Sequence, residues 1–129
     1  MSREDVEVVR AIHERWRRGD SARELFDPEI EWSTPHPDGS AIRGREELLA
    51  LLRRSAGAWQ DFRLELDEIR DVGGHRDLVL FLESARGRVS GLETRVRPTG
   101  IWTVRDGRAI SFKAYGDRTE ALEPVGLRD

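Results

Sequence analysis

The chain has 129 residues, the usual length of one domain, and its 37% apolar and 36% charged residues describe a folded domain with a charged surface. Its net charge of -3 gives no attraction for a phosphate backbone, so nucleic acid is excluded as an expected partner. The absence of cysteine excludes disulfides, thiolate nucleophiles and thiolate metal sites. No signal sequence or apolar segment of membrane length is found, and we expect a cytoplasmic protein with no membrane partner.

The first part of the chain predicts two helices. Apolar residues recur at helical spacing over residues 3–18, and acidic residues stand in the first turn, which is typical of an amphipathic helix. Ser21 and Glu24 form a capping box, which predicts a second, short helix over residues 22–26. Pro28 then prevents this helix from continuing.

A strand, a loop and a third helix are expected next. Ile30 and Trp32 share one face of a strand predicted over residues 29–34. Two prolines keep the residues that follow from forming a helix, so this stretch is predicted to be a loop. After Gly44, glutamates in a first turn and leucines at helical spacing predict a helix over residues 45–58.

In the second half of the chain, apolar and polar residues alternate over residues 62–67, which is typical of a half-buried strand, and the continuous apolar run over residues 78–82 is typical of a strand covered on both faces. Short turns rich in glycine separate these segments, and connections of hairpin length favour antiparallel pairing. Asp117 and Glu120 can cap a last short helix. The four predicted strands span residues 61–71, 77–89, 92–104 and 109–116, and the last helix spans residues 118–122.

Helices gathered against one face of a curved sheet leave a tapering interior, which side chains fill at the narrow end and leave open at the wide end. We therefore predict an α+β fold in which a cone-shaped, antiparallel or mixed sheet packs on three N-terminal helices and encloses a pocket. Residues 1–129 are expected to form a single domain of this kind.

Four short motifs occur in order on these predicted elements. With them the chain resembles SnoaL-like domain proteins of the nuclear-transport-factor-2-like superfamily, across nearly its whole length. The resemblance implies a cystatin-like cone, and since this fold hosts isomerases, cyclases, dehydratases, epoxide hydrolases and binding domains, it implies no single reaction. The motifs are Arg18-Gly19-Asp20, Asp27-Pro28-Glu29-Ile30-Glu31-Trp32, Arg43-Gly44-Arg45-Glu46 and Ile101-Trp102-Thr103-Val104-Arg105-Asp106-Gly107.

The catalytic residues of three related enzyme groups are absent at the corresponding positions. The steroid isomerases and polyketide cyclases that the chain resembles carry polar catalytic side chains at positions that hold Ile12, Thr34, Gly100 and Ala114 here. Epoxide hydrolases of this fold carry Arg-x-Asp where this chain has Arg76-Asp77-Leu78. A shift of one residue in register would reverse the face of each strand side chain and bring Asp77 or Asp117 into consideration.

Two residues of the predicted loop are candidates for proton transfer. His36 lies where related enzymes keep a base, and an imidazole can titrate near neutral pH. We predict acid–base roles for His36 and Asp38, with an exposed loop histidine as the alternative. Thr34, beside them, either orients a ligand or bonds its own loop.

A hydrophobic pocket is expected to be lined by aromatic side chains, which suit flat ligands. The alternative is that these side chains belong to the core, and for the histidine on the first helix this is the favoured interpretation. Gly100 removes a side chain from the predicted inner face, which would enlarge the cavity. The predicted pocket residues are His13, Trp16, Trp32, Thr34, Trp59, Gly100 and Trp102. The histidine spacings fit no metal site, and we expect neither a metal nor a cofactor.

The outer face of the sheet is a candidate dimer surface. Arg95, Arg97 and Tyr115 are predicted to lie there, and the resemblance implies a homodimer, with a solvated face as the alternative. Two functions stay open. One is a cofactor-independent isomerase, cyclase, dehydratase or hydrolase that acts on a hydrophobic or aromatic small molecule. The other is a ligand-binding or dimerisation domain that has lost catalysis.

Overall fold

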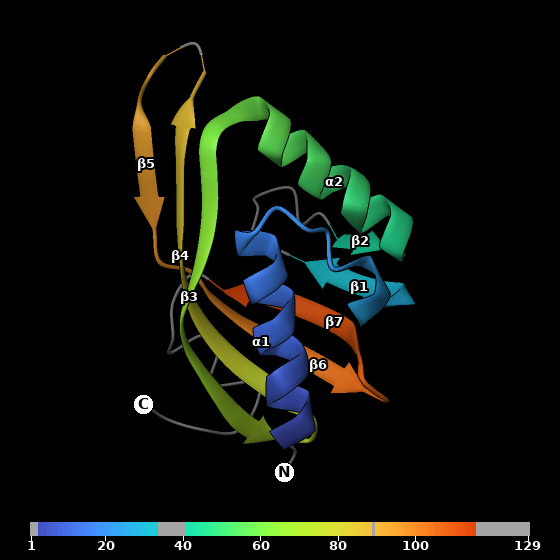
Figure 1. Cartoon of the computed structure of the whole chain (residues 1–129). Helices are drawn as coiled ribbons and strands as arrows, with labels where there is room; N and C mark the ends of the chain where they lie inside the picture. Colours follow the sequence, from blue (N-terminus) through green and yellow to red (C-terminus); the bar gives the residue numbers. More distant parts are fainter. Residues whose placement is uncertain (1–2, 34–40, 89, 116–129) are drawn as a thin grey trace.

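The structure, a computed structural model, describes residues 3–33, 41–88 and 90–115, which form two α-helices and a curved sheet of seven strands (Figure 1). The helices are α1 (Arg3–Arg17) and α2 (Arg45–Ala58), and a 3-10 helix, η1 (Arg23–Leu25), lies between them in the chain. The strands are β1 (Phe26–Ser33), β2 (Ala41–Arg43), β3 (Trp59–Gly73), β4 (Arg76–Gly87), β5 (Glu93–Val96), β6 (Thr99–Arg105) and β7 (Arg108–Tyr115). The predicted α+β fold is confirmed.

The sheet is mixed. Its strands follow the order β2-β1-β7-β6-β4-β3, and β5 pairs with β4. The pairings are antiparallel except for that of β1 with β7, which is parallel. No hairpin joins these two strands, since most of the chain runs between them, so the preference of short connections for antiparallel pairing does not apply.

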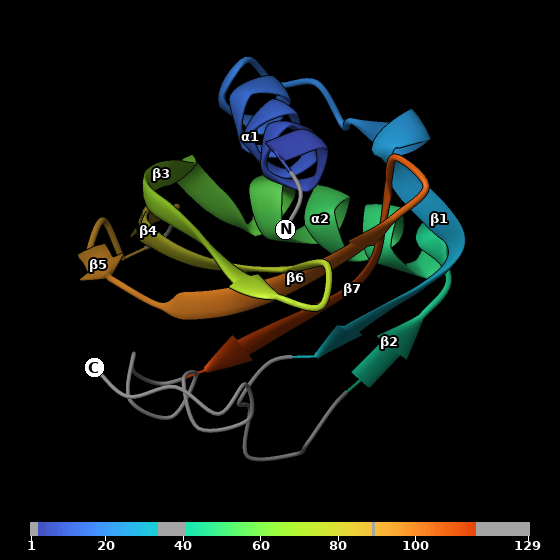
Figure 2. The same ribbon diagram turned by 90° about the horizontal axis from the view of Figure 1, so that it is seen from below.

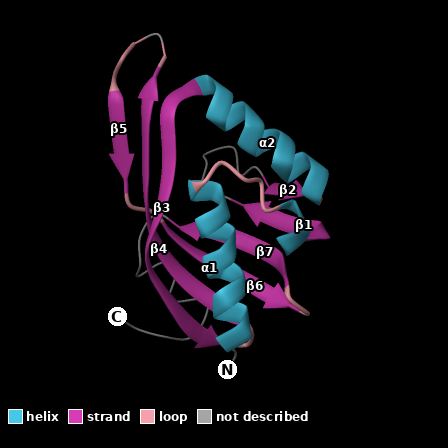
Figure 3. Ribbon diagram, viewed as in Figure 1, coloured by secondary structure: helices cyan, strands magenta, loops and turns pink. Residues whose placement is uncertain are grey.

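Both α-helices lie on the concave side of the sheet. Figure 2, the view from below, places α1 and α2 together on this side, and Figure 3 shows the strands bending around them. The register of β3 against β4 shifts near Arg63 and Glu68, and bulges of this kind increase the local bend and twist of a strand. The sheet curves without closing, and α1 lies across it in contact with β3, β4, β6 and β7.

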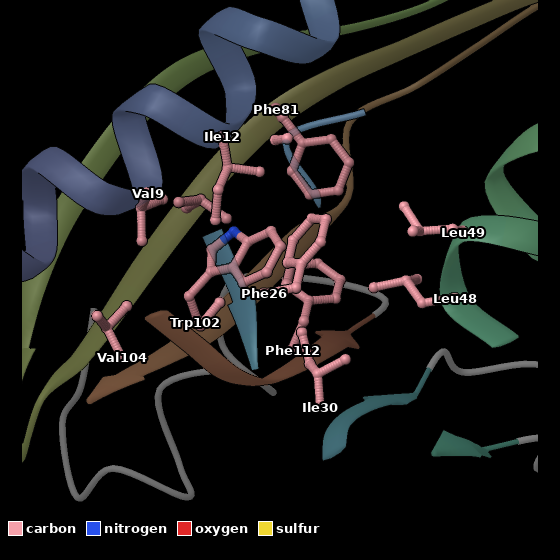
Figure 4. Close-up of a cluster of buried hydrophobic side chains, with 13 residues drawn as sticks. Val9, Ile12, Phe26, Ile30, Leu48, Leu49, Phe81, Trp102, Val104 and Phe112 are labelled. Atoms are coloured by element: carbon pink, nitrogen blue, oxygen red, sulfur yellow. The ribbon is translucent and has the colours of Figure 1, made fainter. Parts of the chain in front are cut away.

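The core between the sheet and the helices is rich in aromatic side chains (Figure 4). Trp102 and Phe26 are fully buried, and their rings stack with centroids 6.3 Å apart. Val9 and Ile12 of α1 and Leu48 of α2 close this core from the helix side. Burial of one large apolar side chain contributes about 1.5–3 kcal/mol to stability, so this cluster supplies much of what holds the helices to the sheet.

The prediction of a short helix over residues 22–26 is wrong. Residues 23–25 form a single 3-10 turn, and Phe26 already belongs to β1. Ala22 has left-handed backbone angles with φ of 59°, and its N–H donates to Oδ1 of Asp20. Burial of the Phe26 ring in the sheet core overrides the local capping signal. The described residues therefore contain two α-helices where three were expected.

The strand predicted over residues 92–104 is divided into β5 and β6. Arg97 and Pro98 separate the two strands, because proline has no N–H to donate to a neighbouring strand. Ala41–Arg43, which the sequence did not predict as a strand, pairs with β1 as β2. The helix predicted over residues 118–122 lies outside the described part of the chain.

Candidate functional site

A cleft of about 800 Å³ opens between the C-terminal end of α1, α2 and β3. Its volume lies within the range of small-molecule sites in proteins. The apolar part of its wall consists of Trp16, Leu49, Leu52 and Leu64. Its polar part consists of Arg17, Asp20, Ser21, Arg53, Arg63 and Glu65.

The loop after α1 fixes the indole ring of Trp16. Gly19 ends the helix with a positive φ of 83°, and its N–H donates to the carbonyl oxygen of Trp16. The chain then turns back, so that Nε1 of Trp16 donates to the carbonyl oxygen of Ser21 at 3.2 Å. The only polar atom of the Trp16 side chain is thus bonded to the protein, and its ring is left as an apolar wall.

Behind Trp16 the aromatic rings pack against one another. The centroid of the Trp16 ring lies 6.2 Å from that of Trp32 and 5.9 Å from that of Trp102. Phe112 closes the other side, with its ring 4.4 Å from that of Trp32 and 4.6 Å from that of Trp102. Of these rings, Trp16 reaches the cleft, whereas Trp32 and Trp102 pack in the aromatic core behind it.

The space that Gly100 leaves on the inner face of β6 is already filled. A Cβ atom at this position would lie 2.4 Å from two carbon atoms of the Phe112 ring, which is far inside van der Waals contact. The glycine therefore admits the Phe112 ring. The expected enlargement of the cavity at Gly100 is wrong.

His13 is a buried, neutral imidazole of α1. Its side chain is 3% exposed, and its Nε2 accepts the N–H of Trp102 at 3.2 Å, which places the imidazole proton on Nδ1. Nδ1 has no hydrogen-bond partner among the described residues. Burial lowers the pKa of His13 to about 4, so the ring is uncharged near neutral pH. Trp16, whose ring meets it edge to face, lies in contact with it and lines the cleft.

Glu83 is a candidate residue that the sequence analysis missed. It lies on β4 directly opposite Leu64 of β3, so the two side chains share the concave face. Glu83 is half-buried, and burial raises the pKa of its carboxyl above the ordinary value. The signal was the period-two stripe Val79, Phe81, Glu83 and Ala85, in which a carboxylate takes an inward position.

A second cluster of titratable groups lies at the β3–β4 turn, beneath the first turns of α1. Asp77 is fully buried next to Trp102 and opposite Asp71, and neither of its carboxylate oxygens has a hydrogen-bond partner among the described residues. Burial, followed by the charges of Asp71 and Asp5, raises the pKa of Asp77 to about 7. Nδ1 of His75 lies 2.9 Å from Oδ2 of Asp5. None of these four residues lines the cleft.

Several predicted site residues lie outside the part of the chain that the structure describes. Thr34, His36 and Asp38 fall within residues 34–40, outside the described part, and the Trp59 side chain is also outside it. Their predicted roles stay predictions. In the described part, no group of three or more His, Cys, Asp or Glu side chains is placed to hold a metal ion. Neither described helix is both long and apolar enough to cross a membrane.

The two arginines and the tyrosine of the predicted dimer surface have different surroundings. Arg95 lines a groove of about 230 Å³ on β3, β4 and β5, and Nη1 of Arg97 forms an ion pair with Oδ2 of Asp67 at 2.7 Å. Tyr115 packs against the small cluster of Leu78 and Ile101 on the convex face. A homodimer through this face remains a proposal from the sequence.

Comparison with known proteins identifies the family of this chain. A family model described as a SnoaL-like domain matches residues 9–112 of the chain. No curated protein sequence matches it.

Solved structures with the same fold span almost the whole chain. An ntf2-like protein of unknown function from Burkholderia pseudomallei K96243 has 24% identity and a TM-score of 0.77, covering 98% of this chain and 100% of that chain. A hypothetical protein from Catenulispora acidiphila DSM 44928, with a ketosteroid isomerase-like fold and in complex with trimethylamine, has 16% identity, coverage of 94% and 93%, and a TM-score of 0.74. An LEH-like epoxide hydrolase from M. tuberculosis has 20% identity, coverage of 95% and 89%, and a TM-score of 0.73. At sequence identities of 16%, 20% and 24%, this similarity shows a shared fold.

Proposed function

Since the chain belongs to the SnoaL-like domain family, whose model spans residues 9–112, we propose that it binds a hydrophobic or aromatic small molecule in the cleft between α1, α2 and β3. The observation that carries this proposal is the wall of the cleft, where the fixed indole of Trp16 stands with leucines from α2 and β3. Apolar walls interrupted by a few polar groups are typical of sites for flat organic ligands.

Leu52→Asp is expected to weaken the binding of a neutral aromatic compound such as 2-naphthamide by about tenfold or more, because a ligand in the cleft would desolvate the new carboxylate. Leu52 is half-buried and belongs to the apolar wall. Isothermal titration calorimetry measures the affinity, and quenching of tryptophan fluorescence gives a second readout, since Trp16 lines the site.

The matched control is Leu92→Asp, because Leu92 is 70% exposed and lies outside the cleft. This variant should bind 2-naphthamide like the unmodified protein. Equal affinities for all three proteins would exclude the cleft as the binding site. An unmodified protein that binds no member of a panel of naphthalene, biphenyl and anthracene compounds would contradict the proposal itself.

A catalytic function of the same region is the second candidate, as a cofactor-independent isomerase, cyclase, dehydratase or hydrolase. Glu83 favours it, because its carboxyl lies on the concave face, where burial raises its pKa above the ordinary value, and a carboxyl in such a place is suited to proton transfer. Its cross-strand neighbour Leu64 lines the cleft. His36 and Asp38 are proposed, on the sequence alone, as further acid–base residues.

Glu83→Gln and His36→Ala are each expected to lower turnover by at least about tenfold while leaving the affinity for 2-naphthamide nearly unchanged. The measurement is turnover of a panel of cyclic enones, epoxides and linear polyketone mimics, with circular dichroism to verify folding. Turnover that survives both substitutions would remove the acid–base assignment. Binding of aromatic compounds with no turnover of any substrate would favour the ligand-binding domain without catalysis.

A further inference from the structure

We propose that the C-terminal segment, residues 116–129, covers an apolar patch of Leu78 and Ile101 on the convex face of the sheet. This cover is independent of the cleft and of its ligand. Leu78 of β4 and Ile101 of β6 lie opposite each other in the sheet and are 0% and 6% exposed. Their side chains point to the convex face, because Val79 and Trp102, the next residue along each strand, belong to the core on the concave face.

The burial of this patch requires a cover that the described elements do not supply. Both described α-helices lie on the concave side of the sheet (Figure 2). In the described part of the chain, the apolar side chains that pack against the patch are Val72 and Tyr115, and both are themselves half-buried. A side chain on the open face of an antiparallel sheet is in contact with water, and Leu82, which points to the same face farther along β4, is only half-buried. The cover therefore has to come from chain outside the described residues.

The place where β7 ends favours the C-terminal segment. Tyr115, the last residue of β7, pairs with Thr99 of β6, which is 1% exposed and points to the same face as Ile101. The chain thus leaves the sheet beside the patch. Neighbouring strands lie about 4.8 Å apart, so β4 lies about 10 Å from β7 across β6, whereas residues 116–129 span up to about 45 Å when extended.

The composition of residues 116–129 suits such a contact, because burial of apolar side chains is favourable. The large apolar residues of the segment are Leu122, Val125 and Leu127. Residues 34–40, another stretch outside the described part, contain no leucine, isoleucine or valine. With the C-terminal segment over the patch, Tyr115 contacts its own chain, and a second subunit is left with the part of the convex face that carries Arg95.

The chain has no cysteine, so a single introduced cysteine can report on the cover. Ile101→Cys should react with iodoacetamide at least about a hundredfold more slowly than Leu92→Cys, since Leu92 is 70% exposed. The serine variant of the segment carries Leu122→Ser, Val125→Ser and Leu127→Ser. In this variant the rate at Ile101→Cys should rise by at least about tenfold, because the uncovered thiol meets water.

Two controls separate loss of the cover from loss of the fold. Val79→Cys, at a fully buried position on the concave face, should react slowly with and without the serine substitutions. Glu123→Ser combined with Arg128→Ser changes polar residues of the same segment without changing its net charge, and it should leave the rate at Ile101→Cys unchanged. Thr99→Cys, a substitution of similar size on the same face, repeats the test if Ile101→Cys does not fold by circular dichroism.

A contact within one chain protects the cysteine equally at every protein concentration. Protection that disappears on dilution, together with the mass of two chains by light scattering, would assign the cover to a second copy and overturn the proposal. A slow rate that persists in the serine variant, or an Ile101→Cys that reacts as fast as Leu92→Cys in the otherwise unmodified chain, would overturn it as well.

Discussion

Asp77→Asn is expected to stabilise the protein by on the order of 3 kcal/mol more at about pH 8 than at about pH 4.5, measured as the free energy of unfolding in urea. The carboxyl of Asp77 is fully buried, has no hydrogen-bond partner in the described structure and stands opposite Asp71. Burial and the neighbouring carboxylates raise its pKa to about 7. Near pH 8 the folded protein must therefore hold an unpaired charge in its interior.

The sign of this effect follows from the two pKa values. In the unfolded chain Asp77 titrates near 3.8, so between this value and about 7 the folded state binds a proton that the unfolded state has lost. The stability that the protonated group contributes is complete below 3.8 and is lost as the pH rises to about 7. Asparagine has nearly the same shape and does not ionise, so the advantage of the variant grows with pH.

Asp106→Asn removes the same charge at an exposed position in the β6–β7 turn, where φ is 53° and asparagine is well tolerated. Its stability difference from the unmodified protein should change by less than about 0.5 kcal/mol over the same pH range. A difference between the unmodified protein and Asp77→Asn that does not depend on pH would contradict the burial of a charged Asp77.

His13→Gln is expected to act in the opposite direction. Relative to the unmodified protein, its free energy of unfolding should rise by on the order of 3 kcal/mol as the pH falls from about 7 to about 4. Burial lowers the pKa of His13 from 6.5 to about 4, so the unfolded chain takes up a proton that the folded state refuses. The stability that the neutral ring contributes is complete above 6.5 and is lost as the pH falls to about 4.

Glutamine can accept the N–H of Trp102 with its amide oxygen but fills less space than an imidazole, so the variant loses stability at every pH and the change with pH carries the information. His13→Phe keeps an aromatic ring beside Trp16 and loses the acceptor instead. Both variants should show the same change with pH despite different absolute stabilities. A pH dependence that differs between them would show that the titration belongs to another group.

Together the two groups give opposite slopes over nearly the same range. Between about pH 4 and pH 6.5 the fall in stability from Asp77 and the rise from His13 nearly cancel. The unmodified protein should therefore show little pH dependence from these groups in this range, and each single variant should reveal the slope of the group that remains.

The sequence predicted the parts of the fold that depend on local spacing. The apolar stripe that carries Val9 and Ile12 identified α1, and the leucines after Gly44 identified α2, because a helix buries residues that recur every three or four positions. The capping signal at Ser21 and Glu24 was misleading, since burial of Phe26 in the sheet decides the conformation there. Local signals cannot weigh such distant contacts.

The candidate site was harder to predict, because it depends on which side chains meet across the fold. The tryptophans were predicted to line one pocket, with a place in the core as the alternative. In the described structure Trp16 lines the cleft, and Trp32 and Trp102 pack behind it. The sequence places Gly100 in a predicted pocket, yet the ring of Phe112 on the neighbouring strand β7 occupies the space beside it. The inward position of a carboxylate such as Glu83 can be recognised from the alternation of side chains along β4 once the pairing of β4 with β3 is known.

The parallel pairing of β1 with β7 has a consequence for biosynthesis. β1 is made early, yet the neighbour that joins it to the main sheet is the strand from Arg108 to Tyr115, roughly eighty residues later. On the ribosome, Phe26 and Ile30 must wait for this late strand before they reach their final surroundings. Completion of the sheet therefore has to await the synthesis of β7, and nascent chains that stop before Arg108 should remain sensitive to proteases in the region of β1.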